Sequence, residues 1–292
     1  RAEAIGFDSR PYDALLYSEP GMTISQLEAL FAQLKETIVP LVRLIRERSD
    51  AVDDSCLYRN SPPDRQLGLV SGVVSRLGFD FERGRIDASA HPFMIHINPG
   101  DVRLTNRVSA GFLQASIFGG IHESGHGMYG QGVDPELAQT GLWDGCSNGF
   151  HESQSRLYEN LLGRSRPFWR YWYGEFQAAF PEALGDVDLE TFYRAINVVH
   201  PSLIRVEADE VTYNLHILLR VEVENELLEG KLRVAEVPDA WNAKMEEYLR
   251  VEPPDHAQRS KQEIHWTFAA GLGVFPSYTL VHVRSAQRMA YI

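Results

Sequence analysis

The spacing of apolar residues is helical over most of the chain. In the clearest stripe, apolar residues recur every three or four positions, at Leu27, Leu30, Phe31, Leu34, Ile38, Leu41 and Ile45. Thr23 and Gln26 precede this stripe at the spacing of a capping box, which predicts where its helix begins. The same periodicity predicts further helices over residues 65–77, 109–130, 147–162, 167–180, 189–199, 202–232 and 237–250. We therefore expect a mainly α-helical protein.

Residues 79–105 break the helical pattern. Short runs of β-branched and aromatic residues alternate there with turn signals at residues 83–84 and 98–101. The runs predict strands over residues 79–81, 85–87, 93–97 and 102–105. We expect a small antiparallel sheet directly before the next helix. The edge of such a sheet can pair with an extended peptide through backbone hydrogen bonds that ignore side-chain identity.

The helix predicted over residues 109–130 contains the sequence His122-Glu123-Ser124-Gly125-His126. Residues four apart lie on the same helical face, so His122 and His126 can direct a ring nitrogen at one ion. Glu123 is then placed to take a proton from the attacking water, as in zinc peptidases. A solvated helical face could carry the same residues, but residues 112–121 are too apolar for a surface helix. The pattern favours a buried zinc site.

A catalytic zinc ion takes three protein ligands and keeps one position open. Glu152 is the best candidate for the third ligand, because it opens a second amphipathic segment that could pack against the first. His151 is the competing candidate, although on a helix it faces about a third of a turn away from Glu152. In the alternative interpretation both are ordinary residues at the start of a helix.

Composition restricts the partners and the compartment. With 292 residues, 44% of them apolar, the chain can bury a large core in one domain or two lobes. Its 28 basic and 40 acidic residues give a net charge of −12, which argues against nucleic acid or an anionic membrane as a partner.

We find neither a signal peptide nor an apolar segment long enough to span a bilayer. The two cysteines, Cys56 and Cys146, are too few for a disulfide framework and predict the reducing cytoplasm. Because the chain begins at Arg1 and not at Met, we expect it to be processed or to be part of a longer protein.

Several motifs together resemble the carboxypeptidase Taq family of zinc metallocarboxypeptidases. Residues 101–105 match the family motif D-x-R-x-T, residues 122–126 match H-E-x-x-H, residues 151–154 match H-E-S-Q at the family's spacing, and residues 204–209 match I-R-x-x-A-D. The last motif, G-x-x-Q-D-x-H-W, is met only in part, since Arg259 replaces the glycine and Glu263 replaces the aspartate. The resemblance includes residues 11–16 and 275–280 and so covers nearly the whole chain.

The resemblance implies zinc on His122, His126 and Glu152, with Co²⁺ or Mn²⁺ as substitutes, and Glu123 as the general base. It implies a large, mainly α, zincin-like metallopeptidase with a deep active-site groove, usually a homodimer. Such enzymes remove single residues from peptides with a free C-terminus, with broad preference but poor tolerance of a C-terminal proline. Because family members are longer, we expect residues 1–292 to form a single peptidase domain without the family's N-terminal helical segment and C-terminal helices.

Further roles follow from the matched positions. A planar guanidinium suits a terminal carboxylate, and Arg205 is the best candidate. Arg103 is the alternative, unless Asp101 holds it as a structural ion pair. Tyr278, and after it His265, are candidates to stabilise the oxyanion, although a structural role for this tyrosine is equally open. Asp209, Asp101 and Ser153 are candidates to orient the ligands, whereas ordinary structural positions are expected for His91, His96, His200 and His216.

The leading hypothesis is thus a zinc carboxypeptidase. An oligopeptidase or endopeptidase with the same zinc chemistry is the nearest alternative, because a shorter chain could leave the groove open. A catalytically impaired fragment that binds peptides is the alternative from a different class, and the altered last motif motivates it. The intact Glu123 argues against an impaired fragment.

Overall fold

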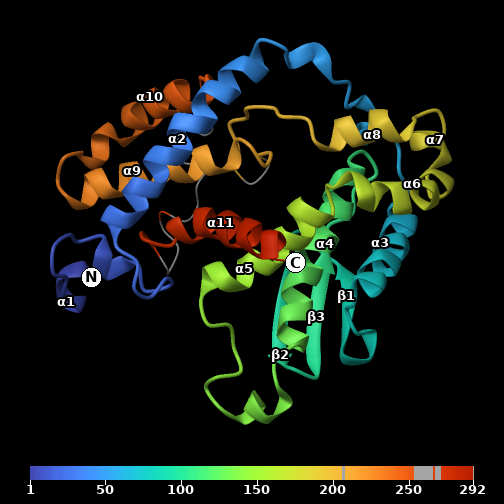
Figure 1. Ribbon diagram of the computed structural model, residues 1–292, viewed down its shortest axis with the longest axis horizontal. Helices are drawn as coiled ribbons and strands as arrows, with labels where there is room; N and C mark the ends of the chain where they lie inside the picture. The colour runs from blue at the N-terminus through green and yellow to red at the C-terminus, as the bar shows by residue number, and fades with distance from the viewer. Residues whose placement is uncertain (206–207, 253–265, 267–270, 292) are drawn as a thin grey trace. The chain divides into compact units, whose positions relative to one another are not determined.

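The computed structural model describes residues 1–205, 208–252, 266 and 271–291. The chain folds into two compact units (Figure 1). Unit 1 comprises Arg1–Ala51 and Val199–Leu280, and unit 2 comprises Val52–Val198 and Val281–Ile292. Helix α11 (Pro276–Tyr291) contributes its first residues to unit 1 and the remainder to unit 2. Both units are mainly helical, as predicted.

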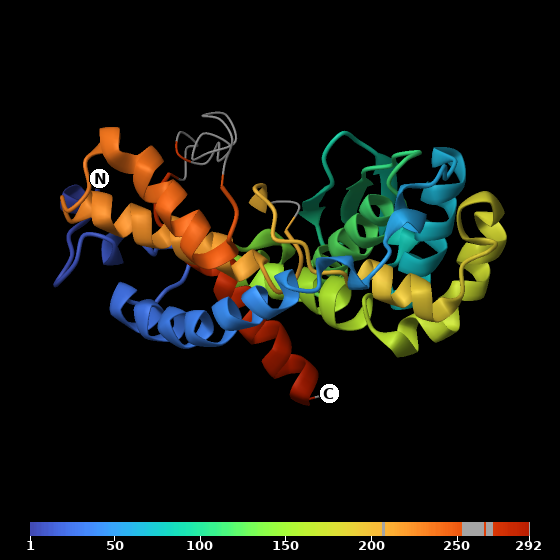
Figure 2. The ribbon, with the colours of Figure 1, turned by 90° about the horizontal axis from the view of Figure 1, so that it is seen from above.

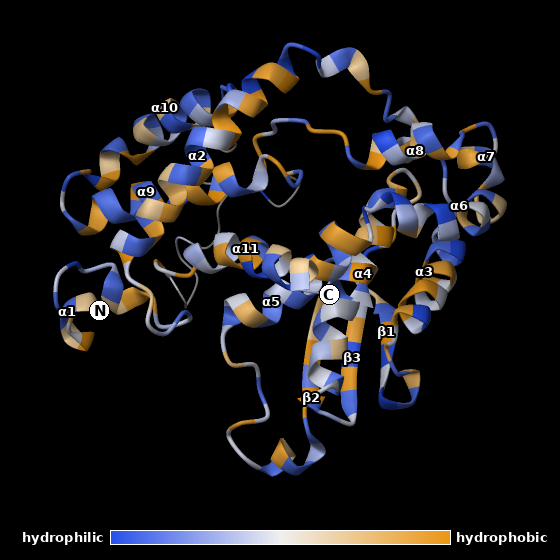
Figure 3. Cartoon of the chain, viewed as in Figure 1, coloured by the Kyte–Doolittle hydropathy of each residue, from blue (hydrophilic) through white to orange (hydrophobic). Residues whose placement is uncertain are grey.

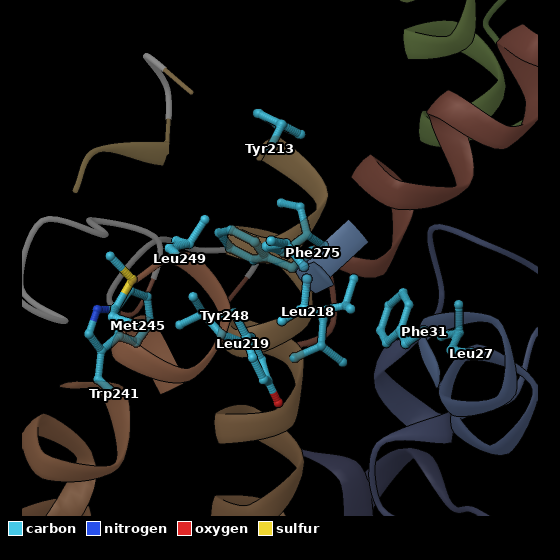
Figure 4. Packing of buried hydrophobic residues seen from close by; sticks show 14 of the residues in the cluster. Leu27, Phe31, Tyr213, Leu218, Leu219, Trp241, Met245, Tyr248, Leu249 and Phe275 are labelled. Atoms are coloured by element: carbon cyan, nitrogen blue, oxygen red, sulfur yellow. The ribbon is translucent and has the colours of Figure 1, made fainter. Parts of the chain in front are cut away.

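Unit 1 is built on three helices that pack together: α2 (Ile24–Arg46), α9 (Tyr213–Leu228) and α10 (Val237–Leu249), drawn in blue and orange in Figure 2. A four-residue helix, α1 (Ala2–Ile5), precedes them. The predicted capping box starts α2, because Gln26 N donates to Thr23 Oγ1 at 3.3 Å and Thr23 N donates to Gln26 Oε1 at 2.9 Å. Apolar and polar residues intermix along α2 (Figure 3). The predicted stripe faces the core of the unit as far as Ile38, but beyond it Val42 is buried and Leu41 is 42% exposed. Figure 4 shows side chains of α2, α9 and α10 gathered there with Phe275.

One helix of unit 1 begins later than the sequence pattern predicts. The periodicity predicts a helix from residue 202, but α9 begins at Tyr213. Asp209 explains the delay, since its carboxylate accepts hydrogen bonds from the backbone of Val211 at 2.9 Å and Thr212 at 3.0 Å. Bonds of this kind cap the N-terminus of a helix, so the helical turns begin only after Asp209.

Unit 2 contains the helices α3 (Pro63–Leu77), α4 (Leu113–Gln131), α5 (Asn148–Arg156), α6 (Arg166–Ala179), α7 (Pro181–Leu184) and α8 (Leu189–Ile196). A π-helical segment, Leu157–Leu162, continues α5. Short 3₁₀ turns lie elsewhere in the chain, at Asp13–Leu15, Ser49–Ala51, Ser55–Tyr58, Phe81–Arg83, Pro135–Gln139 and Val234–Glu236. The core of the unit is aromatic: Trp169, Phe176 and Phe192 pack with Ile117 and Ile121 of α4. This packing buries the helix that carries the histidine motif.

The sheet of unit 2 has three strands, β1 (Gly84–Ala88), β2 (Phe93–Asn98) and β3 (Asp101–Asn106), in the order β1-β3-β2. The strands β2 and β3 are antiparallel, as predicted, but β1 runs parallel to β3, so the expected all-antiparallel sheet is wrong. Val102 and Leu104 of β3 are fully covered, in keeping with its central position. The chain reverses between β1 and β2 and again between β2 and β3, so β1 runs parallel to β3 where the two are neighbours. The chain between β1 and β2 passes the end of β3 and places the two other strands on its opposite sides.

The strand expected over residues 79–81 is also wrong. Asp80 accepts a hydrogen bond from Glu82 N at 2.9 Å and starts a 3₁₀ turn, while Phe79 packs into the apolar cluster below the sheet.

Figure 1 shows α4 lying along the sheet. Among the described residues, no helix has the combined length and apolar character that crossing a membrane requires. The deep groove and the single peptidase domain stay predictions.

Candidate metal centre

The site is formed by two helices of unit 2 that approach each other unusually closely. A Cβ atom on Gly125 of α4 would lie 2.6 Å from Ser155 Cα and 2.8 Å from the carbonyl oxygen of Gln154. Only glycine therefore allows the backbone of α5 to come so near. Ser153 and Ser155 are fully buried on the facing side of α5. Small residues on both helices thus bring Glu152 next to the two histidines of α4.

Three side chains converge at this crossing. His122 Nε2 lies 3.3 Å from Glu152 Oε1, and His126 Nε2 lies 3.0 Å from Glu152 Oε2. One potential ligand atom from each of the three residues lies within 4.8 Å of the others. The structure therefore brings together the three residues that the sequence suggested as ligands. It places His151 on the far side of the His126 ring.

The second nitrogen of each histidine has its own partner. His122 Nδ1 donates to Glu159 Oε2 at 2.8 Å, and His126 Nδ1 lies 2.7 Å from His151 Nδ1. The His151 ring also packs edge-on against Tyr129, with ring centroids 4.9 Å apart. Partners of this kind fix the orientation and the tautomer of metal-binding histidines. Both rings are thus held with Nε2 directed toward Glu152.

The charges around these rings favour a cation. Burial alone would disfavour a charged imidazole, but Glu152 and Glu159 outweigh it and raise the pKa of His122 to about 9. Burial likewise opposes the charge on Glu152, yet His122 and His126 hold its pKa well below the usual range. Burial and the neighbouring His126 lower the pKa of His151 to about 4, so this ring is neutral at pH 7. The arrangement stabilises positive charge between the two histidines and Glu152.

Glu123 lies beside the first histidine on α4 and is 6% exposed. Burial raises the pKa of its carboxyl group, while the charges of His122 and His126 act in the opposite direction. A carboxylate with a raised pKa is the kind of group that accepts a proton near neutral pH. The role of Glu123 as the general base stays a prediction.

The three converging residues fit a divalent metal ion. Two imidazoles and one carboxylate are a known ligand set of catalytic zinc, which leaves a fourth position open. The side chains are not sealed off, since His122, His126 and Glu152 remain 17%, 14% and 15% exposed. The partly buried partners at both Nδ1 atoms complete a site that is suited to hold a metal and to admit a reactant.

Two other predicted residues come together in unit 1. The Arg205 guanidinium lies 5.5 Å from the centre of the Tyr278 ring and 5.1 Å from that of Phe275. Its Nη1 also donates to Tyr213 Oη at 3.1 Å, and the residue is only 6% exposed. Arg205 is therefore a cation enclosed by aromatic rings, and Tyr278 belongs to the same cluster.

The remaining predicted residues have other partners. Arg103 on β3 forms two hydrogen bonds of 2.8 Å with Asp101, the structural ion pair considered as its alternative. Ser153 Oγ donates to the carbonyl oxygen of Phe150 at 2.6 Å, and Asp209 holds the turn before α9. The candidate His265 lies outside the described residues.

Sequence reasoning missed two residues beside the site. Glu159 is the partner of His122, and Arg156 lies between Glu152 and Glu159, at 3.6 Å and 3.0 Å from their carboxylates. The sequence could have pointed to them through their spacing, because Glu152, Arg156 and Glu159 recur at intervals that place them on one helical face. His282 of α11 is a further buried histidine, and burial followed by the Arg156 charge lowers its pKa to about 3.

Comparison with known proteins identifies the family. The family model described as carboxypeptidase Taq (M32) metallopeptidase matches residues 1–292. The chain is 48% identical over 278 residues to thermostable carboxypeptidase 1 of Thermus thermophilus, covering 94% of this chain and 54% of that protein. It is 43% identical over 283 residues to carboxypeptidase 1 of Bacillus subtilis, covering 97% and 56%.

A solved structure agrees with these relatives. The M32 carboxypeptidase from Deinococcus radiodurans R1 matches with a TM-score of 0.95 at 42% identity, over 99% of this chain and 58% of that protein. The chain thus spans little more than half the length of the relatives it matches. On this evidence, the chain belongs to the carboxypeptidase Taq (M32) metallopeptidase family.

Proposed function

We propose that this chain carries the catalytic centre of a zinc metallocarboxypeptidase, which releases residues from the free C-termini of peptides. The observation that carries the proposal is the convergence of His122, His126 and Glu152, with a hydrogen-bond partner at the second nitrogen of each histidine. The family, whose curated relatives are named carboxypeptidases, supports peptides as substrates.

His122, His126 and Glu152 would hold the ion, and their ligand set suits Zn²⁺, with Co²⁺ or Mn²⁺ as substitutes. When bound, zinc would lower the pKa of water toward about 7 and polarise the carbonyl of the scissile bond. Glu123 then takes the proton of the attacking water and delivers it to the departing amine. Its burial supports this role, because a carboxyl group with a raised pKa both accepts and returns a proton readily.

Recognition of a free C-terminus requires a fixed cation. We assign this role to Arg205, because its guanidinium is buried, always charged and held in place by Tyr213 and the rings around it. Tyr278, in the same cluster, is the first candidate to donate a hydrogen bond to the oxyanion, and His265 is the second. Arg103 is the weaker candidate for the carboxylate, since Asp101 already occupies its guanidinium.

We assign the edge of β2 to hydrogen-bond the main chain of an extended substrate. Within the described residues β2 pairs only with β3, so its other edge is open to a further strand. Its His96 side chain packs against Gly130, one turn beyond His126 on α4. Pairing through the backbone is indifferent to side chains, which supports broad preference. A C-terminal proline is disfavoured, because it turns the scissile bond into a tertiary amide without an N–H group.

The proposal also includes the compartment and the oligomeric state. Cys56 and Cys146 are both free thiols, which supports the cytoplasm as the compartment. A homodimer is proposed from the family resemblance alone. Cell fractionation and light scattering of the purified protein test these two points.

The decisive experiment is the hydrolysis of an N-blocked dipeptide with a free C-terminus, alongside its C-terminal amide, with and without a chelator. We expect cleavage of the free acid only, and loss of this cleavage on chelation. Cleavage of both substrates would favour an endopeptidase. Absence of any cleavage in the zinc-loaded protein would favour a catalytically impaired peptide-binding fragment.

A further inference from the structure

Glu159 occupies an uncommon place in the backbone of unit 2. It lies in the π-helical segment Leu157–Leu162, where Gly163 N donates to the carbonyl oxygen of Tyr158 at 2.7 Å, five residues back. Segments of this kind are rare and frequently occur at functional sites. Here the segment directs the carboxylate of Glu159 to the ring of His122, which lies on another helix.

His122 is enclosed by two carboxylates that come from one helical stretch. Glu152 lies 3.3 Å from its Nε2 and Glu159 lies 2.8 Å from its Nδ1. An ionised carboxylate only accepts hydrogen bonds, so Glu159 fixes the ring proton on Nδ1. In the neutral ring the lone pair is then left on Nε2, the atom that faces Glu152 and His126. Glu159 thus selects the single neutral tautomer that can bind a metal at the crossing of α4 and α5.

Glu159 is itself held by two arginines. Arg156 Nη1 lies 3.0 Å and Arg164 Nη2 lies 3.9 Å from its carboxylate oxygens. Arg164 is anchored in turn, because it donates to the carbonyl oxygen of Ile196 and its guanidinium lies 3.8 Å from the centre of the Phe118 ring. These contacts place two cations beside the partly buried carboxylate and restrict its movement.

The two histidines of the site therefore have unequal partners. His126 shares a single proton with the ring of His151 across 2.7 Å, so one imidazole donates and the other accepts. The partner of His122 is an anion supported by two cations. A hydrogen bond to an anion is about twice as strong as one between neutral groups, and it increases the basicity of the ring.

We propose that Glu159 is a positioning residue of the metal centre, which fixes the tautomer of His122 and strengthens it as a ligand. The inference rests on the proposed function, because it requires that His122 bind a metal. It adds a partly buried residue outside the three proposed ligands, and this residue acts through His122.

The test compares the 292-residue chain with its variants Glu159→Gln, Glu159→Leu and Glu175→Gln. Glutamine keeps an acceptor for His122 Nδ1 but removes the charge, and leucine removes both. Glu175 is exposed on α6 and serves as the matched control. Circular dichroism of the metal-free proteins checks that each variant is folded. Zinc affinity is measured by competition with a chromophoric chelator, and the visible absorption spectrum of the Co²⁺-loaded protein reports on the ligand field.

We expect the zinc affinity to fall about tenfold in Glu159→Gln and further in Glu159→Leu, in the range usual for partners of ligand histidines. The cobalt spectrum should shift in Glu159→Gln, and both readouts should stay unchanged in Glu175→Gln. Zinc affinity and spectrum equal to the wild type in Glu159→Gln would overturn the inference and leave the proposed function intact. Failure of the wild-type chain to bind zinc would overturn the proposed function and this inference with it.

Discussion

At the scale of single residues, the site depends on how each imidazole uses its two nitrogens. In His122 and His126 one nitrogen is directed at Glu152, and the other is occupied by Glu159 or His151. Neither ring can therefore rotate or exchange its tautomer without breaking a buried hydrogen bond. The ligands are arranged for an ion before one arrives, which reduces the cost of ordering them on binding.

The role of Glu123 leads to a test that separates binding from chemistry. Replacing it by glutamine keeps the size of the side chain but removes the base. We expect Glu123→Gln to bind zinc and peptide as the wild type does and to lose about 10²–10⁴-fold in kcat. Zinc titration, peptide binding and turnover of the free-acid dipeptide measure the three quantities. Turnover at the wild-type rate would exclude Glu123 as the base.

Residue by residue, the sequence predicted the proposed metal ligands better than the residues that hydrogen-bond to them. His122 and His126 follow from their spacing of four on a helix, and Glu152 from the amphipathic segment that it opens. Glu159 could not be assigned to His122 in the same way, because its direction depends on a π-helical turn and on the packing of two helices. Neither of these follows from a local pattern. His151 was considered as a ligand, whereas its observed contact is with the rear of His126.

At the scale of secondary structure, the crossing of α4 and α5 is the feature on which the site depends. We expect Gly125→Ala to destabilise the protein by about 1–3 kcal/mol, as overpacking usually does, because its Cβ would overlap the backbone of α5. The same overlap should displace Glu152 and weaken zinc binding. Thermal unfolding and zinc titration measure both effects.

Gly174→Ala in α6 is the matched control for this change. A Cβ atom at Gly174 would meet no atom within 4 Å, so alanine there should leave zinc binding unchanged. It should also stabilise the helix slightly, by roughly 0.5–1 kcal/mol, because glycine is unfavourable inside helices. Equal loss of zinc affinity in both variants would mean that the close approach at Gly125 is not what positions Glu152.

The sequence predicted most elements, and the exceptions have local physical causes. Periodicity indicates which residues share a face, so it found the helices and the strands β2 and β3. It carries no information on which strand β1 pairs with, and β1 is parallel to β3 because the chain reverses twice between these two neighbouring strands. The late start of α9 reflects the hydrogen bonds of Asp209, which outweigh an apolar pattern.

At the scale of the whole molecule, acidic residues that are paired with cations in the fold make the free energy of unfolding depend on pH. In unit 1 the Glu222 carboxylate receives Lys35 Nζ at 3.0 Å, Lys244 Nζ at 2.8 Å and Tyr248 Oη at 2.6 Å. Burial opposes its charge, but these three partners dominate and lower its pKa. The folded state thus binds this proton less readily than the unfolded state. The resulting stability is present above the ordinary glutamate pKa and is lost as the pH falls through the lowered value.

We therefore expect Glu222→Gln to unfold more readily than the wild type at pH 7, by about 1–3 kcal/mol, because its buried partners lose a charged acceptor. The difference should begin to shrink as the pH falls below about 4.5, where Glu222 of the unfolded chain takes up a proton, and should vanish as the pH falls through the lowered pKa of the folded protein. Urea unfolding of both proteins in the presence of a chelator measures this difference at several pH values. A difference that stays constant down to pH 3 would show that folding does not lower the pKa of Glu222.

Metal binding should be visible as stability of unit 2, because all three proposed ligands belong to α4 and α5. Zinc that binds only the folded state contributes about 2.7 kcal/mol at a concentration 100 times its Kd. We expect zinc to raise the unfolding temperature of the chelated protein and to slow hydrogen exchange in peptides from residues 113–131 and 148–162. Glu152→Gln removes the anionic ligand and should lose most of both effects. If that variant gained as much as the wild type, the zinc would be binding elsewhere, and the convergence at the helix crossing would not be the metal site.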